Sequence, residues 1–196
     1  MKKTMEDKRI IKTRRNIKST MIRILQTKPF EKITVSELCR EGQISRITFY
    51  TYYDDKYALI DEMVADYIRE ADADYHALQQ QNNPTGDGPK GYQNLLDCIL
   101  NLYARNLPFF SHTAPEENPY LFSVFFNHIF ASVDDYLQRH PNPATPYPTR
   151  EIASLLCNGL WGVITTCQSE GLPQTALRMR VHAVYRAILS SALFRS

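Results

Sequence analysis

The sequence predicts an all-α protein with a small N-terminal head, one long connecting helix and a larger C-terminal helical body. Apolar residues recur at helical spacing along the chain, and no stretch alternates in the manner of a strand. The break in composition NNPTGDGPKG, at residues 82–91, follows the long helix. Residues 1–56 carry 14 Lys and Arg against 7 Asp and Glu, whereas residues 57–196 carry 9 against 14. A basic head on an acidic body indicates a polyanionic partner for the head alone.

The composition excludes several classes of protein. A chain of 196 residues with 43% hydrophobic and 22% charged residues is typical of a globular protein with one good core or two small ones. No apolar run follows the basic start, and no stretch is long enough to span a membrane, so we expect a cytoplasmic protein. No CxxC spacing links the cysteines, which favours free thiols in a reducing compartment over disulfides. The four are Cys39, Cys98, Cys157 and Cys167.

The first elements are a polar arm and a basic amphipathic helix. Residues 1–9 are polar and charged, so we expect a mobile arm. Apolar residues then form a helical stripe over residues 10–27, with most of the Lys and Arg side chains away from it. Pro29 ends this helix, because proline cannot continue the helical hydrogen bonds.

Two short helices joined by a tight turn follow, over about residues 34–53. Thr34 and Glu37 have the spacing of a capping box at a helix start. Gly42-Gln43 interrupts that helix, and Ser45 is placed to cap a second helix that carries Arg, Thr and Tyr side chains. So short a helix must pack on others to be stable. When packed, a helix presenting these side chains suits the major groove of DNA.

The remaining elements are longer helices. Asp54 and Asp55 precede a helix over residues 56–81, where acidic residues are favoured by the helix dipole. Beyond the break at 82–91, apolar spacing and proline or glycine punctuation predict four more helices. We expect them at about 91–106, 117–139, 148–170 and 174–194.

The segment from Arg14 through Leu59 resembles the TetR (tetracycline-repressor-like) family of transcriptional regulators. The resemblance depends on Thr48-Phe49-Tyr50, followed by Tyr53, Asp55-Lys56 and Leu59. Two positions depart from the family pattern. The turn normally reads Ala-Gly, so that Gln43 is expected to take a left-handed conformation. Ile47 replaces a common glycine and puts a branched apolar group where DNA would lie, against a thymine methyl group for example.

The resemblance implies a helix-turn-helix DNA-binding domain over residues 10–56 and an effector-binding and dimerisation domain over residues 57–196. Thr34 and Lys56 would hold backbone phosphates, and Tyr50 and Tyr52 would place their hydroxyls on flanking phosphates. A further set of side chains would face base edges, and Arg46 is the best candidate among them for a bidentate guanine contact. This set comprises Ser45, Arg46, Ile47, Thr48 and Thr51.

The resemblance further implies a small-molecule effector bound between helices of the aromatic-rich body. Bulky rings at helix joints often line apolar pockets, although a core role remains the alternative for each ring. The candidate pocket residues are Tyr103, Phe110, Phe122, Phe126, Trp161 and Thr165. The last two expected helices, 148–170 and 174–194, would pair with those of a second copy. A homodimer would read a pseudo-palindromic operator.

These observations favour a repressor that a small molecule releases from its operator. A partner-binding co-activator that keeps the fold without binding DNA on its own is the alternative. The five histidines have no metal-ligand spacing and no phosphate-binding glycine loop is present. We therefore expect no enzymatic activity, no cofactor and no metal, with His128 as the one mildly catalytic-looking group.

Overall fold

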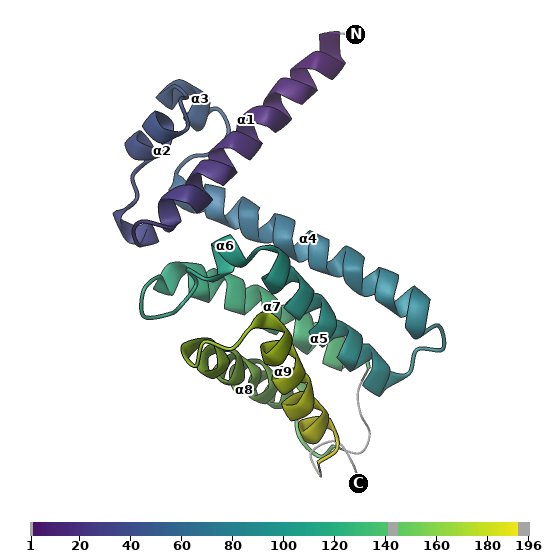
Figure 1. The fold of residues 1–196 in the computed structure, drawn as a ribbon. Helices are drawn as coiled ribbons and strands as arrows, with labels where there is room; N and C mark the ends of the chain where they lie inside the picture. The colour runs from purple at the N-terminus through teal and green to yellow at the C-terminus, as the bar shows by residue number, and fades with distance from the viewer. Residues whose placement is uncertain (1, 141–144, 192–196) are drawn as a thin grey trace. The chain divides into compact units, whose positions relative to one another are not determined.

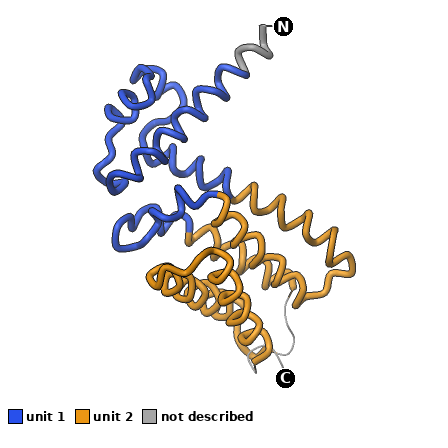
Figure 2. Tube along the Cα trace, viewed as in Figure 1, with its two compact units in different colours: residues 1–67, 106–125 blue, residues 68–105, 126–196 orange. Residues whose placement is uncertain are grey.

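The computed structural model describes residues 2–140 and 145–191, of which residues 2–7 are described by their backbone only. Every regular element in these ranges is helical, which confirms the all-α prediction (Figure 1). The chain divides into two compact units (Figure 2). The first comprises residues 1–67 and 106–125, and the second comprises residues 68–105 and 126–196.

The first unit begins with a helix that is longer than the sequence indicated. α1 spans Lys2–Leu25, so residues 2–9, which were expected to form an arm before the helix, are part of it. Neither glycine nor proline interrupts the polar start, and the helix therefore extends through it. The 3₁₀ turn η1 (Phe30–Lys32) follows Pro29. The two short helices are α2 (Val35–Glu41) and α3 (Arg46–Tyr50).

The expected helix caps are present, with one difference. The Thr34 hydroxyl accepts from the Glu37 backbone N–H at 3.2 Å, and Ser45 accepts from Thr48 N–H at 2.9 Å. The Glu37 carboxylate does not complete the expected capping box. It pairs instead with the Lys28 ammonium, at 2.6 Å, because this cation offers a stronger partner than a backbone N–H.

The long helix α4 spans Lys56–Asn82 and confirms the predicted range closely. Its start is capped by Asp55, whose carboxylate accepts from the N–H groups of Tyr57 and Ala58, both at 2.8 Å. Residues 56–67 belong to the first unit and residues 68–82 to the second.

Residues 106–125, which lie far along the chain, complete the first unit. The short helix α6 (Leu107–Phe110), which the sequence analysis did not predict, and the first turns of α7 (Pro119–Arg139) belong to it. Its core is formed by apolar side chains of α1, η1, α2, α3, α4, α6 and α7. The largest fully buried side chains are Ile17, Met21, Phe30, Ile33, Leu38, Phe49, Leu59, Ile60, Met63, Phe109 and Leu121.

The second unit is a bundle of helices. It comprises the later parts of α4 and α7 together with α5 (Gly88–Arg105), α8 (Thr149–Ser169) and α9 (Gln174–Leu189). α9 ends at Leu189, so the expected extension to residue 194 is wrong for residues 190 and 191, and its remainder lies outside the described residues. α8 packs against α9. The core of the second unit includes Leu96, Leu156, Val181 and Tyr185. The four cysteines are buried and free, and no helix in the described ranges is long and apolar enough to cross a membrane.

Candidate nucleic-acid interface and ligand cavity

A Schellman turn sets the angle between α2 and α3. The N–H of Ile44 donates to Cys39 O at 2.9 Å, and the N–H of Gln43 donates to Arg40 O at 3.2 Å. Gln43 has φ 52°, which confirms the expected left-handed conformation. Gly42 allows a close approach to α1, because a Cβ atom there would lie 3.3 Å from Thr20 Oγ1 on α1, and also 2.9 Å from Leu38 O on α2. The turn is therefore tight on both sides.

We expect Gln43→Gly to stabilise the first unit by about 0.5–1 kcal/mol. A side chain in the left-handed region costs about 1–2 kcal/mol, and the greater freedom of glycine in the unfolded chain offsets part of the gain. The measurement is urea unfolding followed by circular dichroism. A decrease in stability would show that the Gln43 side chain itself makes a stabilising contact. Ser36→Gly, at an exposed position within α2, is the matched control and should destabilise.

α3 presents the predicted base-reading residues on one exposed surface. Arg46, Ile47, Tyr50 and Thr51 are exposed, as is the capping Ser45. The partly buried Thr48 and Tyr52 lie at the edge of this surface, and the exposed Thr34 caps α2. The expected core residues Phe49 and Tyr53 are buried beneath it. The structure thus brings together most of the residues that the sequence assigned to DNA, and their roles on DNA stay a prediction.

Lys56 lies outside this exposed surface, and its ammonium group forms hydrogen bonds within the first unit. Its ammonium group donates to the carbonyl oxygens of Phe30, Glu31 and Ile33 at 2.9, 3.0 and 3.0 Å. These three bonds use all three of its hydrogens. The ammonium also lies 4.5 Å from the centre of the Phe30 ring, and burial lowers its pKa. In this arrangement Lys56 joins the start of α4 to the turn that precedes α2.

Residues at the start of α7 also hold the turn η1. The buried Phe30 N–H donates to Asn118 Oδ1 at 2.6 Å. The Phe30 ring stacks on Tyr120 with 5.5 Å between centroids, and the Tyr120 hydroxyl donates to Asp61 at 3.0 Å. Burial and the neighbouring Asp61 carboxylate raise the pKa of Tyr120 to about 12. The turn is therefore fixed by residues from both α4 and α7.

Part of the positive charge of α1 is also neutralised within the first unit. Arg14 forms an ion pair with Glu62 on α4, and Lys18 forms ion pairs with Glu62 and Asp66. The Arg14 guanidinium in addition lies 5.8 Å from the centre of the Tyr53 ring. These cations hold α1 on α4, which leaves less of the basic charge of α1 available to a polyanion.

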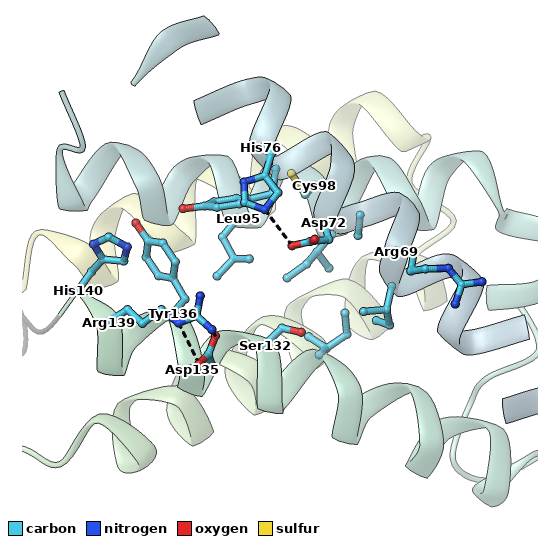
Figure 3. Close-up of a pocket in the computed structure, with 15 residues that line it drawn as sticks. Arg69, Asp72, His76, Leu95, Cys98, Ser132, Asp135, Tyr136, Arg139 and His140 are labelled. Carbon is cyan, nitrogen blue, oxygen red and sulfur yellow. Dashed lines mark hydrogen bonds and ion pairs between the residues drawn. The ribbon is translucent and has the colours of Figure 1, made fainter. Parts of the chain in front are cut away.

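The second unit contains a cavity of about 390 Å³ between α4, α5 and α7 (Figure 3). Its walls are apolar where Leu95, Ile99 and Ile129 line it. Charged and polar side chains line the rest, and Figure 3 shows Arg69 at the opposite end from His140. These polar residues are Arg69, Asp72, Tyr75, His76, Ser132, Asp135, Tyr136, Arg139 and His140.

The polar groups of the cavity form local pairs. His76 Nε2 lies 3.6 Å from Asp72 Oδ1, and Arg139 lies 2.8 Å from Asp135 (Figure 3). Burial raises the pKa of the Cys98 thiol to about 12, so this cavity residue stays protonated and is a poor nucleophile. No cluster suited to a metal ion occurs among the side chains that the structure describes. A cavity with apolar walls on one part and both positively and negatively charged groups on the rest suits a small amphipathic molecule.

The predicted effector residues are placed differently. Phe110 and Phe122 belong to the first unit, whereas Tyr103, Phe126, Trp161 and Thr165 belong to the second. Phe110 is buried against Phe125, with ring centroids 4.4 Å apart, and the Tyr103 hydroxyl accepts from Gln168. The Thr165 hydroxyl donates to backbone oxygens of α8. None of the six lines the cavity of Figure 3, and their role in ligand binding stays a prediction.

Sequence reasoning missed the walls of this cavity and the residue Asn118. A usable signal for the walls was the recurrence of polar residues four positions apart on α4 and α7, as in Asp72 with His76 and Asp135 with Arg139. The sequence offered no comparable signal for Asn118, because its partner is 88 positions away.

With this geometry, the described residues form an all-helical protein with a helix-turn-helix head. Part of the chain is similar in sequence to one curated regulator. The HTH-type transcriptional regulator EthR of Mycolicibacterium smegmatis (strain ATCC 700084 / mc(2)155) is 37% identical over 59 residues. These residues are 30% of this chain, and the match spans about a quarter (27%) of the length of that relative. No family model matches the chain.

Two solved structures share the fold. The flavonoid-responsive regulator FrrA superposes with a TM-score of 0.60 at 14% identity, covering 91% of this chain and 95% of FrrA. The TetR-family repressor FadR of Thermus thermophilus, solved with lauroyl-CoA, gives a TM-score of 0.59 at 18% identity. That match covers 93% of this chain and 96% of FadR. The chain therefore has the fold of these two regulators, which agrees with the fold that the resemblance to the TetR family implies.

Proposed function

We propose that the protein is a DNA-binding transcriptional regulator that reads the major groove with α3. The observation that carries the proposal is the outer surface of this helix, where Arg46, Ile47, Tyr50 and Thr51 are all exposed. The Ser45 cap and the Schellman turn hold the backbone of this surface, so little backbone freedom is lost on binding. The similarity to EthR supports the same function.

In this proposal the residues act in two ways. Arg46 and Ile47 face base edges, while Tyr50, Tyr52 and Thr34 contact flanking phosphates. Lys56 acts first by positioning, because its hydrogen bonds to Phe30 and Ile33 fix the turn that leads into α2. Its charge still contributes to the positive potential of the head.

The test is recovery of DNA by the purified protein. Sheared genomic DNA is incubated with the protein at moderate salt, and the bound fragments are sequenced. We expect sharp peaks that share a pseudo-palindromic site. Uniform recovery that salt abolishes would contradict the proposal, because it would reveal phosphate attraction alone. That result would favour a regulator that acts through a partner protein.

We also propose that the regulator is a homodimer through α8 and α9. These helices pack on each other through buried residues such as Leu156 and Val181. Other positions on them are left exposed and apolar, including Leu155 at 46% and Met179 at 73%. Gly162 on α8 has open space around it, which permits close approach of a second helix. Light scattering should give twice the chain mass of 22.7 kDa, and the mass of a single chain would contradict this part of the proposal.

Binding of a small molecule in the cavity would regulate DNA binding and release the operator. α4 carries Lys56 at its start and lines the cavity with Asp72 and His76. α7 likewise carries Tyr120 at its start and lines the cavity with Tyr136. Two continuous helices therefore connect the cavity walls to the turn before α2. The printed descriptions of FrrA as flavonoid-responsive and of FadR as bound to lauroyl-CoA support a small-molecule effector.

Filling the cavity should imitate an effector. Ala71 lines the cavity on α4, and Ala71→Trp is expected to weaken specific DNA binding by about 5- to 150-fold, the usual range of allosteric coupling. Ala77→Trp is the matched control, because Ala77 is an exposed position of the same helix outside the cavity. The measurement is fluorescence anisotropy with the recovered site. Equal affinity of the two variants would show that the cavity does not control DNA binding.

A further inference from the structure

The hydrogen bonds around α3 limit what its side chains can offer to DNA. The Thr51 hydroxyl donates to Ile47 O at 2.8 Å, so its only hydrogen is already used. The hydroxyls of Ser45 and Thr48 bond each other at 2.8 Å, and Ser45 also accepts from the Thr48 backbone N–H. The hydroxyl groups of Ser45, Thr48 and Thr51 are therefore committed mainly to the helix itself.

Arg46 is the exposed donor that remains at the start of this surface. Within the described ranges it has no hydrogen-bonding or ion-pair partner, in contrast to Arg14, which is paired with Glu62. Its guanidinium is therefore available for a bidentate contact with O6 and N7 of guanine. A single arginine can select one base but cannot by itself define a half-site.

Ile47 is the most exposed large apolar residue among the described residues, with 82% of its surface accessible. Single exposed apolar residues are common on proteins. What distinguishes Ile47 is its place directly after Arg46, in the first turn of the helix that would enter the groove. Its branched side chain offers neither donor nor acceptor, so on DNA it can recognise only an apolar feature.

The major groove offers one such feature on the four standard bases, the C5-methyl group of thymine. We propose that Ile47 selects a thymine through this methyl group, close to the guanine that Arg46 contacts. This inference rests on the proposed function, and it goes further by assigning the chemistry of the half-site. Ile47 would then be a specificity-determining residue, with the hydroxyls of Ser45, Thr48 and Thr51 serving mainly to hold the helix.

Uracil substitution tests the inference, because uracil differs from thymine at this edge only by the missing methyl group. Duplexes that the protein selects from a random-sequence pool are remade with uracil at each thymine in turn. We expect one thymine in each half-site at which the change weakens binding about fourfold, or about fifteenfold when both half-sites carry it. Ile47→Ala should bind the thymine and uracil duplexes equally.

Ile47→Ala is expected to keep the fold, and Ile11→Ala serves as its control. Alanine favours helix, and the Ile47 carbonyl that accepts from Thr51 is a backbone group, so Ile47→Ala should retain its circular dichroism and melting temperature. Ile11→Ala removes an apolar side chain that is 56% exposed on α1, and it should keep the preference for thymine.

The outcomes separate this inference from the proposed function. Failure to select any specific duplex would overturn both. Specific binding that tolerates uracil at every position would overturn the inference and leave the proposed function in place. A thymine preference that persists in Ile47→Ala would assign the methyl contact to another residue, and so would also overturn the inference.

Discussion

Replacing Arg46 with alanine is expected to weaken binding to the specific site by about 5- to 100-fold for each half-site. Arg46 is exposed at the start of α3 and has no partner among the described residues, so its removal leaves no unpaired group in the protein. Binding to scrambled DNA of the same length should fall much less, because non-specific binding depends on the total charge near phosphates. Fluorescence anisotropy with both duplexes gives the ratio.

A matched variant separates base reading from loss of charge. Arg40→Ala also removes one exposed guanidinium from the head, but Arg40 lies on α2 and pairs with Glu41 at 3.4 Å. We expect this variant to keep its preference for the specific site. An equal loss in the two variants would mean that Arg46 contributes charge alone, and the assignment of α3 as the reading helix would then be wrong.

Replacing Phe30 with alanine is expected to lower the free energy of unfolding of the first unit by about 3–5 kcal/mol. The ring is fully buried, stacks on Tyr120 and meets Tyr57 edge to face at 5.3 Å between centroids. Its removal would leave a cavity directly beneath the Lys56 ammonium. The measurement is urea unfolding followed by far-UV circular dichroism.

The single tryptophan provides an internal control for this measurement. Trp161 lies on α8 in the second unit, so its fluorescence reports that unit, whereas circular dichroism reports both. Phe30→Ala should shift the midpoint measured by circular dichroism more than the midpoint measured by fluorescence. Tyr57→Phe, which removes only a hydroxyl 3.3 Å from Glu31, should cost less than about 1 kcal/mol. Similar losses in the two variants would contradict the central role of the Phe30 ring.

Local sequence signals predicted the parts of the molecule that local forces determine. Thr34, Ser45 and Asp55 cap helices because their side chains reach backbone N–H groups two or three positions ahead. Gln43 was predicted to be left-handed because the TetR-like pattern has a glycine at its position in the turn, and its φ of 52° agrees. The range of α4 followed from its apolar spacing and the absence of proline.

Contacts across long stretches of sequence were not predictable in this way. Lys56 reads as a surface cation beside Asp54 and Asp55, and nothing nearby in the sequence indicates that carbonyl groups some 25 positions earlier would surround it. The cavity walls depend on which faces of α4, α5 and α7 meet. Helical spacing shows that a face is apolar, but it does not show which neighbour covers that face.

The hydrogen bond between Phe30 N–H and Asn118 has a consequence for the order of events during synthesis. Proteins emerge from the ribosome with the N-terminus first, and domains generally fold as their residues become available. The two partners here are separated by 88 positions. Residues 1–67 therefore leave the ribosome before Asn118 can accept from the Phe30 N–H and before Tyr120 can cover the Phe30 ring. α2 and the reading helix α3 would acquire their final rigidity only after residues 106–125 have been translated. A nascent chain stalled before that point should therefore bind DNA weakly.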